Sequence, residues 1–497
     1  MLDARQPQLL MRHIRPTVRA WTQRRPPRGD TRSGTRISAP STPGARRRTT
    51  TGAARPIVTA SRGGSHARHQ ERQENHVSSK AKQWALVPLT VLTLVIAGCA
   101  DNNSDKSATG QSDTHCVKTS GNPIVVGDSS QLTGIPGFDP SALPNGEKAA
   151  ADYVNCHGGI DGRPIEVASC DTRYDPAGSK ACAAEAVAKG AIAVTGLDDL
   201  SSSSGADAQY AQNNIVTLNA PNQLPLVDDM NVFAVANGGT GEFYGLGHYF
   251  GAVLKPKSVR LLMPDQPYGH TYSDWIKAAA AAAGLTNIDT VYYNINITDF
   301  SSVVAKLVQD RPAVVFTLVN GSQIPLVWGQ LEQQGIKASQ VYIHSAAMDS
   351  RVLAKAKDVA TGGNIISEFA NPDDLSDPDV KIYRDAMKAA GYDDIARTAL
   401  AVAGFSEIMF LATVAKTVSK STGPARVNAQ SVKAYLSKTL GAGSKQTIPV
   451  FLGTPMGAAA KGFYGIHRGA VQILSWDGSK FVTSVSFFTA PELGPAA

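Results

Sequence analysis

The chain of 497 residues predicts an α/β protein with two Rossmann-like lobes, each built on a parallel sheet. Apolar, strand-like runs alternate with helical segments, and this alternation favours a mostly parallel sheet covered by helices on both faces. The cycle occurs twice, and the second cycle begins after VFAVANGG at 232–239. A hydrophobic content of 42% is enough to form the hydrophobic cores of folded domains.

The elements of the first cycle are expected over PIVVGDSS, NGEKAAADYVN, RPIEVASC, PAGSKACAAEAVAKG, AIAVTG, a Ser-rich helix start, and IVTLNAP. Those of the second are GEFYGLGHYFGAVLK, SVRLLMPD, YSDWIKAAAAAAG, DTVYYN, SSVVAKLVQD, AVVFTLVN, LVWGQLEQQG and QVYIHS. The chain then gives NIISEFA, a long helical region around RTALAVAGFSEIMFLATVAKTV, and a β-rich end, GAVQILSWDGSKFVTSVSFF. Ligands of such sheets bind beyond the carboxyl ends of the strands.

The net charge of +7 is unevenly distributed along the chain. Residues 1–98 contain 18 Lys and Arg against 4 Asp and Glu, whereas residues 99–497 contain 30 against 37. The basic character therefore belongs to the first part, and the acidic remainder excludes nucleic acid as a partner.

Residues 1–76 are rich in Arg, Pro, Thr and Gly and have no sustained hydrophobic period. Such a segment cannot bury enough apolar surface to fold, so we interpret it as a disordered basic leader without a function. Secretory signals normally begin their chains, and translation is therefore expected to start near Val77. The Arg pairs of the leader are not followed by an apolar stretch, which excludes a twin-arginine signal.

Residues 77–98 are expected to be a lipoprotein signal peptide. The uncharged run WALVPLTVLTLVIA at 84–97 is long enough for a signal and too short to span a bilayer, although a buried core helix is the alternative. It ends in Ile-Ala-Gly-Cys, which resembles a bacterial lipobox and predicts lipid anchoring to the membrane through Cys99. The polar residues 99–121 would form a flexible tether.

Four further cysteines, Cys116, Cys156, Cys170 and Cys182, allow three pairings in an exported chain. Cys170 ends a strand and Cys182 lies in the next helix, so a strand-loop-helix hairpin would join these two and leave Cys116 to pair with Cys156. The chain has no CxxC pair, and the histidines after residue 99 are scattered. No metal site is expected.

Two adjoining segments resemble a known family: NCHGGIDGRPIEV at 155–167 and CDTRYDPAGSKACAAEAV at 170–187. They are similar to the first helix-turn-strand-loop-helix of type I periplasmic binding proteins of the branched-chain amino-acid ABC importer class, the leucine/isoleucine/valine-binding-protein-like lipoproteins. The resemblance continues through AVTG, through PYGH at 267–270 and through the terminal GAVQILSWDGSKF, and covers nearly all of 122–487.

The resemblance implies two discontinuous lobes joined by a three-crossing hinge, with one small ligand in the cleft between them. The N-terminal lobe would comprise 122–240 and 367–465, and the C-terminal lobe 241–366 and 466–497. The crossings would fall near 238–246, 364–370 and 463–468. The expected partners are a small-molecule ligand and ABC permease subunits, with the protein acting as a monomer.

Strand-end loops are the expected ligand-binding positions. Ser201 and Ser202 open a helix, where hydroxyls and free N–H groups can hold a carboxylate, although simple N-capping is the alternative. The resemblance adds Asn219, Asn222 and Gln223 after the next strand of the first lobe. It also adds Tyr268, Asn320, Gly321 and Ala346 from the second lobe.

Ala346 departs from the family pattern. The resemblance implies a carboxylate there in amino-acid binders, which pairs with the ligand ammonium. Burying an ammonium without such a partner is costly, so we expect a small neutral or anionic solute unless another acid such as Asp349 moves in.

A rival motif, Gly239-x-Gly241-x-x-x-Gly245 with Asp265 after the next strand, resembles a dinucleotide site. Free nicotinamide cofactors are not expected outside the membrane, so no cofactor is predicted. GxSxG, HExxH and GxxxxGK[ST] are all absent. The preferred function is therefore capture of an amino acid, amide or carboxylate for ABC import, before a ligand sensor that signals to a membrane receptor and, last, an exported enzyme.

Overall fold

The computed structural model describes residues 116–134, 139–196, 204–218, 231–460, 463 and 465–494. The predicted leader, the signal peptide and Cys99 lie outside the described residues, as does most of the predicted tether.

The first sheet is parallel and has the strand order β2-β1-β3-β4. Its strands are β1 (Ile124–Ser130), β2 (Ile165–Asp171), β3 (Ala193–Thr195) and β4 (Val216–Thr217). Side chains of neighbouring residues point to opposite faces, so Ile124 and Val126 join the cluster around α1 (Ala142–Cys156), whereas Val125 and Val194 pack with α2 (Pro176–Ala188) and α3 (Ser204–Gln212).

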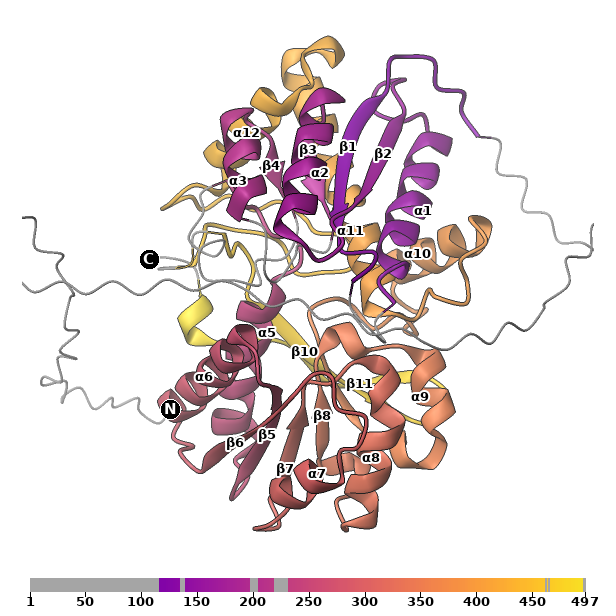
Figure 1. Ribbon diagram of the computed structural model, residues 1–497. Coiled ribbons are helices and arrows are strands. Elements are labelled where there is room, and N and C mark those ends of the chain that lie inside the picture. The colour runs from indigo at the N-terminus through magenta and orange to yellow at the C-terminus, as the bar shows by residue number, and fades with distance from the viewer. Residues whose placement is uncertain are drawn as a thin grey trace, which may run out of the picture. The chain divides into compact units, whose positions relative to one another are not determined.

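Three helices from much later in the chain complete this lobe: α10 (Pro378–Ala389), α11 (Ala399–Thr422) and α12 (Ala429–Leu440). Their apolar side chains share one core with β1 and α1. Among the described helices α11 alone is long and apolar enough to cross a membrane, but most of it is buried in this core. It is therefore the central helix of a lobe (Figure 1).

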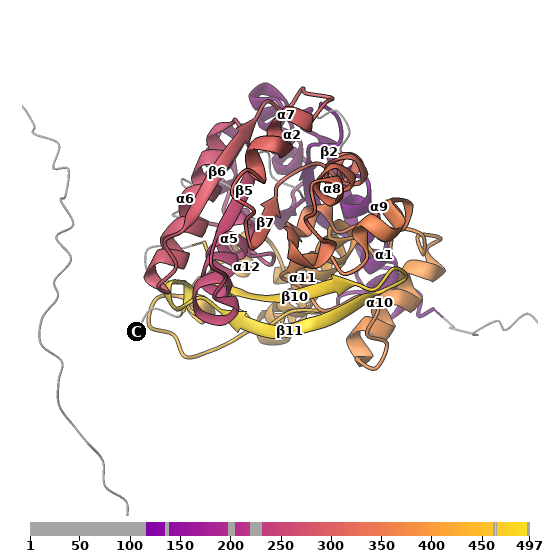
Figure 2. The same ribbon diagram turned by 90° about the horizontal axis from the view of Figure 1, so that it is seen from below.

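The second sheet has the order β11-β10-β9-β8-β7-β5-β6. Its parallel strands are β5 (Val259–Pro264), β6 (Ile288–Tyr293), β7 (Val314–Thr317), β8 (Val341–Ile343) and β9 (Asn364–Ser367). The antiparallel pair β10 (Ala470–Trp476) and β11 (Phe481–Thr489) extends one edge (Figure 2). The β-rich end of the chain thus completes a sheet that begins more than 200 residues earlier.

Helices cover both faces of this sheet. One core contains α5 (Gly238–His248), its π-helical continuation η1 (Tyr249–Leu254) and α6 (Pro267–Ala282), and the other contains α7 (Ser301–Leu307), α8 (Ile324–Gln333) and α9 (Ser350–Ala356). Short 3-10 turns lie at η2 (Gly321–Gln323), η3 (Ala338–Gln340), η4 (Ser345–Ala347), η5 (Lys357–Ala360), η6 (Pro424–Arg426) and η7 (Pro491–Leu493).

The chain passes between the lobes three times, before α5, after β9 and before β10. Buried Arg468 ties the three passages together: it donates one hydrogen bond to the carbonyl oxygen of Val235 at 2.6 Å and another to the carbonyl oxygen of Glu368. The Glu368 carboxylate in turn accepts a bond from the amide of Gly238 at 3.0 Å. These bonds satisfy backbone amide and carbonyl groups in the crossing segments, where no strand partner is present to bind them.

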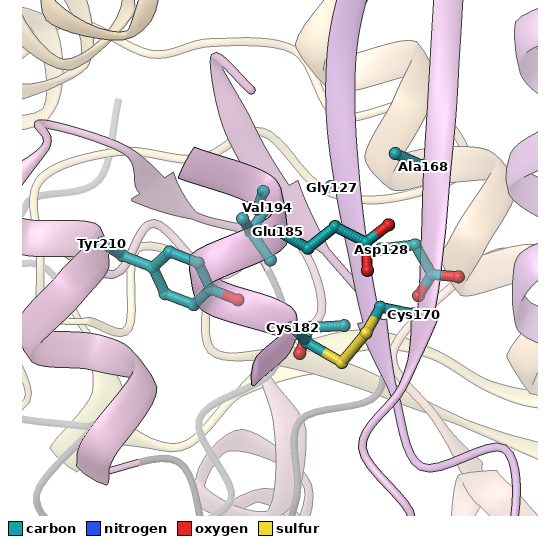
Figure 3. A pocket seen from close by; sticks show the side chains of 10 residues that line it. Gly127, Asp128, Ala168, Cys170, Cys182, Glu185, Val194 and Tyr210 are labelled. Atoms are coloured by element: carbon teal, nitrogen blue, oxygen red, sulfur yellow. A yellow bond between two sulfur atoms is a disulfide. The ribbon is translucent and has the colours of Figure 1, made fainter. Parts of the chain in front are cut away.

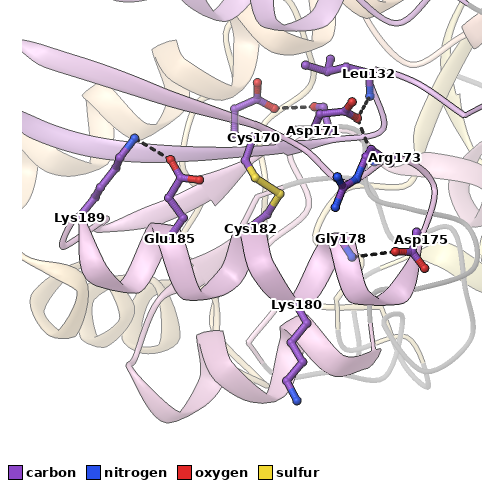
Figure 4. Close-up of a disulfide and its surroundings, with 12 residues drawn as sticks. Leu132, Cys170, Asp171, Arg173, Asp175, Gly178, Lys180, Cys182, Glu185 and Lys189 are labelled. Atoms are coloured by element: carbon purple, nitrogen blue, oxygen red, sulfur yellow. Dashed lines mark hydrogen bonds and ion pairs between the residues drawn. A yellow bond between two sulfur atoms is a disulfide. The ribbon is translucent and has the colours of Figure 1, made fainter.

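Both predicted disulfides are present. Cys116 joins the segment before β1 to Cys156 at the end of α1, with Cα atoms 4.3 Å apart. Cys170 at the end of β2 joins Cys182 in α2, with Cα atoms 5.5 Å apart (Figure 4). The side chain of Asp175, which accepts a bond from the amide of Gly178 at 3.2 Å, begins α2 close to this second disulfide.

Candidate functional site

A cavity of about 220 Å³ receives side chains from both lobes. Leu143 of α1, Ala403 of α11 and Gly196 after β3 come from the first lobe. The second lobe supplies residues that follow β5, β6, β7 and β8, which is the carboxyl edge of its parallel strands. This is the position at which open α/β sheets bind ligands.

The structure places some of the predicted ligand-binding residues at this cavity and does not describe others. Tyr268, Asn320 and Ala346 line the cavity. Gly321 begins the turn η2 after Asn320 and is not among the lining residues. The remaining five predicted positions lie outside the described residues: Ser201, Ser202, Asn219, Asn222 and Gln223.

Three buried glutamates line the same cavity: Glu242 of α5, Glu368 after β9 and Glu407 of α11. No sequence motif pointed to them, because they belong to no common pattern and are far apart in the chain. Each is less than 9% exposed. They are the main feature of the site that the sequence analysis missed.

The carboxylate of Glu242 is hydrogen-bonded to Ser345, in the turn η4 after β8. Its Oε1 accepts a hydrogen bond from the amide of Ser345 at 2.7 Å, and its Oε2 accepts one from the Ser345 hydroxyl at 2.8 Å. Burial raises the pKa of Glu242 to about 8, with a further rise from the charge of Glu368 and an opposing effect of the Ser345 bonds. Glu242 is therefore mostly protonated at neutral pH.

Glu407 accepts a hydrogen bond from the amide of Gly196 through Oε2 at 3.1 Å. Its Oε1 accepts no bond from any other described residue. Burial raises the pKa of Glu407 well above its usual range, and the nearby charges of Asp128 and Glu368 raise it further. Burial also raises the pKa of Glu368, although Arg468 opposes this effect. Burial thus favours the neutral form of each of the three acids.

An aromatic wall faces the cavity. Tyr272 is its centre, with ring centroids 4.3 Å from Phe243 and 5.8 Å from Tyr268. Tyr293 also lines the cavity and donates its hydroxyl hydrogen to the carbonyl oxygen of Leu318 at 2.9 Å. This wall offers apolar area and ring faces to a ligand.

His344 adds a neutral polar group. Its Nε2 lies 3.2 Å from the carbonyl oxygen of Val319, which can only accept, so Nε2 carries the hydrogen and Nδ1 is an acceptor. Burial lowers the pKa of His344 to about 4. The imidazole is therefore uncharged at neutral pH.

The family model described as periplasmic binding protein matches residues 123–443. The chain belongs to the periplasmic binding protein family. Its fold is the type I fold of the branched-chain amino-acid class, as the sequence predicted. Members of this family bind small molecules outside the cytoplasm and work with ABC permeases.

The Leu/Ile/Val-binding protein homolog 2 of Brucella abortus (strain 2308) is 27% identical over 301 residues, which are 59% of this chain and 78% of the relative. A fatty acid ABC transporter substrate-binding protein from Thermomonospora curvata superposes with a TM-score of 0.62 at 17% identity, over 76% of this chain and 96% of that one. The branched-chain amino acid transporter substrate binding protein LivJ from Streptococcus pneumoniae, in complex with isoleucine, superposes with a TM-score of 0.57 at 17% identity. The match covers 74% of this chain and 100% of that one. The structural likenesses show the shared fold.

Asp349, which the sequence offered as a substitute acid for this periplasmic binding protein, is already engaged. It begins α9 by accepting a bond from the amide of Arg351 at 2.8 Å, and its carboxylate pairs with the guanidinium of Arg351 at 2.7 Å. The loop after β8 nevertheless has an acid beside it, because Glu242 reaches Ser345 from α5. The sequence of the loop does not reveal this contact, because Glu242 and Ser345 are 103 residues apart in the chain.

The glycines of the rival dinucleotide motif serve packing. A Cβ at Gly239 would lie 2.7 Å from the ring of Tyr272, and one at Gly245 would lie 2.4 Å from Cγ2 of Val471. Asp265 pairs with His270 at 2.9 Å. Close helix packing therefore explains these glycines without a phosphate ligand.

A second hollow lies between β1 and α2, next to the Cys170–Cys182 disulfide (Figure 3). Asp128 and Tyr210 line it, but its volume for a water-sized sphere is about 0 Å³. It has no room for a ligand.

Proposed function

We propose that this chain is an extracytoplasmic solute-binding lipoprotein that captures a small polar organic solute for ABC-type import. The observation that carries the proposal is the cavity whose walls come from both lobes, at the carboxyl edge of the second sheet. Closure of two lobes around one solute gives a permease a surface that differs between the empty and the loaded protein. Anchoring through Cys99 would keep a monomeric protein close to that permease.

A thermal-shift screen of the full chain, purified in detergent, tests solute capture. The compounds are amino acids, amines, amides and small carboxylates, including aromatic acids. A true ligand at a hundred times its Kd stabilises the fold by about 2.7 kcal/mol, which gives a readable rise in Tm. Absence of stabilisation by every class would contradict the proposal.

Import is separated from sensing by an uptake measurement. Cells that lack the gene should lose uptake of the compound that the screen identifies, and a plasmid copy should restore it. Normal uptake in the deletion strain, together with a lost transcriptional response to the compound, would favour a ligand sensor instead.

A further inference from the structure

We propose that the preferred ligand is an organic cation, an amine with an apolar, aromatic-sized body and no carboxylate, whose ammonium group pairs with Glu407 in a cavity that Glu242 also lines. This inference rests on the proposed solute-binding function and names the class of solute. It is the reverse of the neutral or anionic solute that Ala346 suggested.

The charges that line the cavity favour a cation. Three carboxyl groups line it, and no lysine or arginine does so among the described residues. The internal segments that the structure does not describe contain one basic residue, Lys461. An anion would therefore find no cationic partner among these residues, and leaving a buried charge unpaired costs several kcal/mol.

Glu407 provides the open acceptor. It is 1% exposed, it lines the cavity, and its Oε1 has no partner among the described residues. A carboxylate oxygen can accept several hydrogen bonds, so this oxygen is available to a donor in the cavity. An ammonium donor from the ligand would satisfy it and would stabilise the ionised form.

The aromatic wall suits the rest of such a ligand. Tyr268, Tyr272 and Phe243 present adjoining rings to the cavity that contains the acids. Ring faces attract cations and also pack against apolar groups. An amine with an aromatic body uses both properties.

Binding should release a proton. The charged and titratable groups that face Glu407 are Asp128 of β1, Glu147 of α1 and Glu368. All of them are acids, so the ionised form of Glu407 is costly until a cation arrives. In the proposed step the ligand binds as R–NH3+, a carboxylic acid becomes a carboxylate, and its proton passes to the buffer.

Glu242 faces a similar environment. Glu368 and the Tyr272 hydroxyl lie near it, and Ser345 donates both of its hydrogen bonds. Neutral His344 lines the same cavity. Ionisation of Glu242 is therefore also coupled to the arrival of positive charge.

The test compares 2-phenylethylamine, phenylalanine, 3-phenylpropanoate and 3-phenylpropanamide, which share a body and differ in charge. Calorimetry on the full chain in detergent should give the tightest binding for the amine and at least about 30-fold weaker binding for the anion. In phosphate and in Tris at pH 7, the difference in heat should correspond to release of about one to two protons per amine bound, because Glu407 and Glu242 can each ionise.

Two variants and a control complete the test. Glu407→Gln and Glu242→Gln should each weaken amine binding by at least about tenfold and leave amide binding unchanged, since Gln keeps the shape and loses the charge. Glu332→Gln, on the exposed face of α8, should change nothing. Equal or tighter binding of phenylalanine or the anion, or unchanged amine binding in both variants, would overturn the inference while solute binding itself stands. If none of the four compounds nor any compound of the wider screen binds, the proposed function fails as well.

Discussion

Glu242 and Ser345 are joined by two hydrogen bonds, one from the amide and one from the hydroxyl of Ser345, at 2.7 and 2.8 Å. The pair links the helix that follows the first lobe crossing to the loop that follows β8. It thereby fixes an acid at the wall of the cavity. Two predictions depend on this pair.

Ser345→Ala should raise the pKa of Glu242 further, because the bonds from Ser345 lower it in the native protein. Loss of the hydroxyl should also reduce the free energy of unfolding by about 1 to 3 kcal/mol, since a buried acceptor loses a donor. Urea unfolding at several pH values measures both effects. Ser437→Ala, at an exposed position of α12, is the matched control. An unchanged pH profile in Ser345→Ala would show that the hydroxyl bond has no influence on the acid.

The ligand-free protein should lose stability between about pH 5 and pH 8. The folded pKa of Glu242 is about 8 and the unfolded value is near 4.5, so the unfolded chain holds fewer protons in this window and unfolding becomes easier as the pH rises. Glu242→Gln removes this contribution. Its Tm should therefore exceed that of the native chain increasingly toward pH 8, whereas Glu332→Gln should follow the native curve. Parallel curves for all three proteins would refute the raised pKa.

The two disulfides should contribute unequally to stability. In the chain-entropy model the separations of 40 and 12 residues correspond to about 4 and 3 kcal/mol for Cys116–Cys156 and Cys170–Cys182. Replacing each pair by Ser and measuring urea unfolding tests the order. Peptide mapping without reductant should find these two pairs alone, and a peptide that joins Cys170 to Cys156 would contradict the pairing.

Gly146 and Gly404 allow α1 and α11 to pack backbone to backbone. A Cβ at Gly146 would lie 2.2 Å from the carbonyl oxygen of Ala401, and a Cβ at Gly404 would lie 2.3 Å from that of Leu143. Either change to Ala should destabilise the fold by about 1 to 3 kcal/mol or more, because neither neighbour can move freely. Gly329→Ala is the control, since nothing lies within 4 Å of its Cβ and helix α8 should gain about 0.5 to 1 kcal/mol. Wild-type stability in both close-contact variants would count against this packing.

Cys99→Ser should release the protein from membranes, because the thiol is the predicted site of lipid attachment. Cell fractionation and immunoblotting at equal expression measure the distribution. Cys116→Ser should leave the distribution unchanged. A membrane-bound Cys99→Ser protein would exclude anchoring at this residue.

The sequence by itself determined the alternation of strands and helices, the family, and both disulfides. These features depend on short-range patterns: apolar runs of strand or helix length, and cysteines that one strand-loop-helix unit brings together, as for Cys170 and Cys182. The resemblance to the family added Tyr268, Asn320 and Ala346, which line the cavity.

Only the tertiary structure decided the chemistry of the cavity. Glu242, Glu368 and Glu407 come from different elements, and the lobe crossings and the packing of α11 bring them together. In the sequence each is a single glutamate outside any motif, which an exposed side chain would explain equally well. Their burial, the loss of water around them and their mutual repulsion arise only when distant segments pack, and these are the effects that shift their pKa values and select the charge of a ligand.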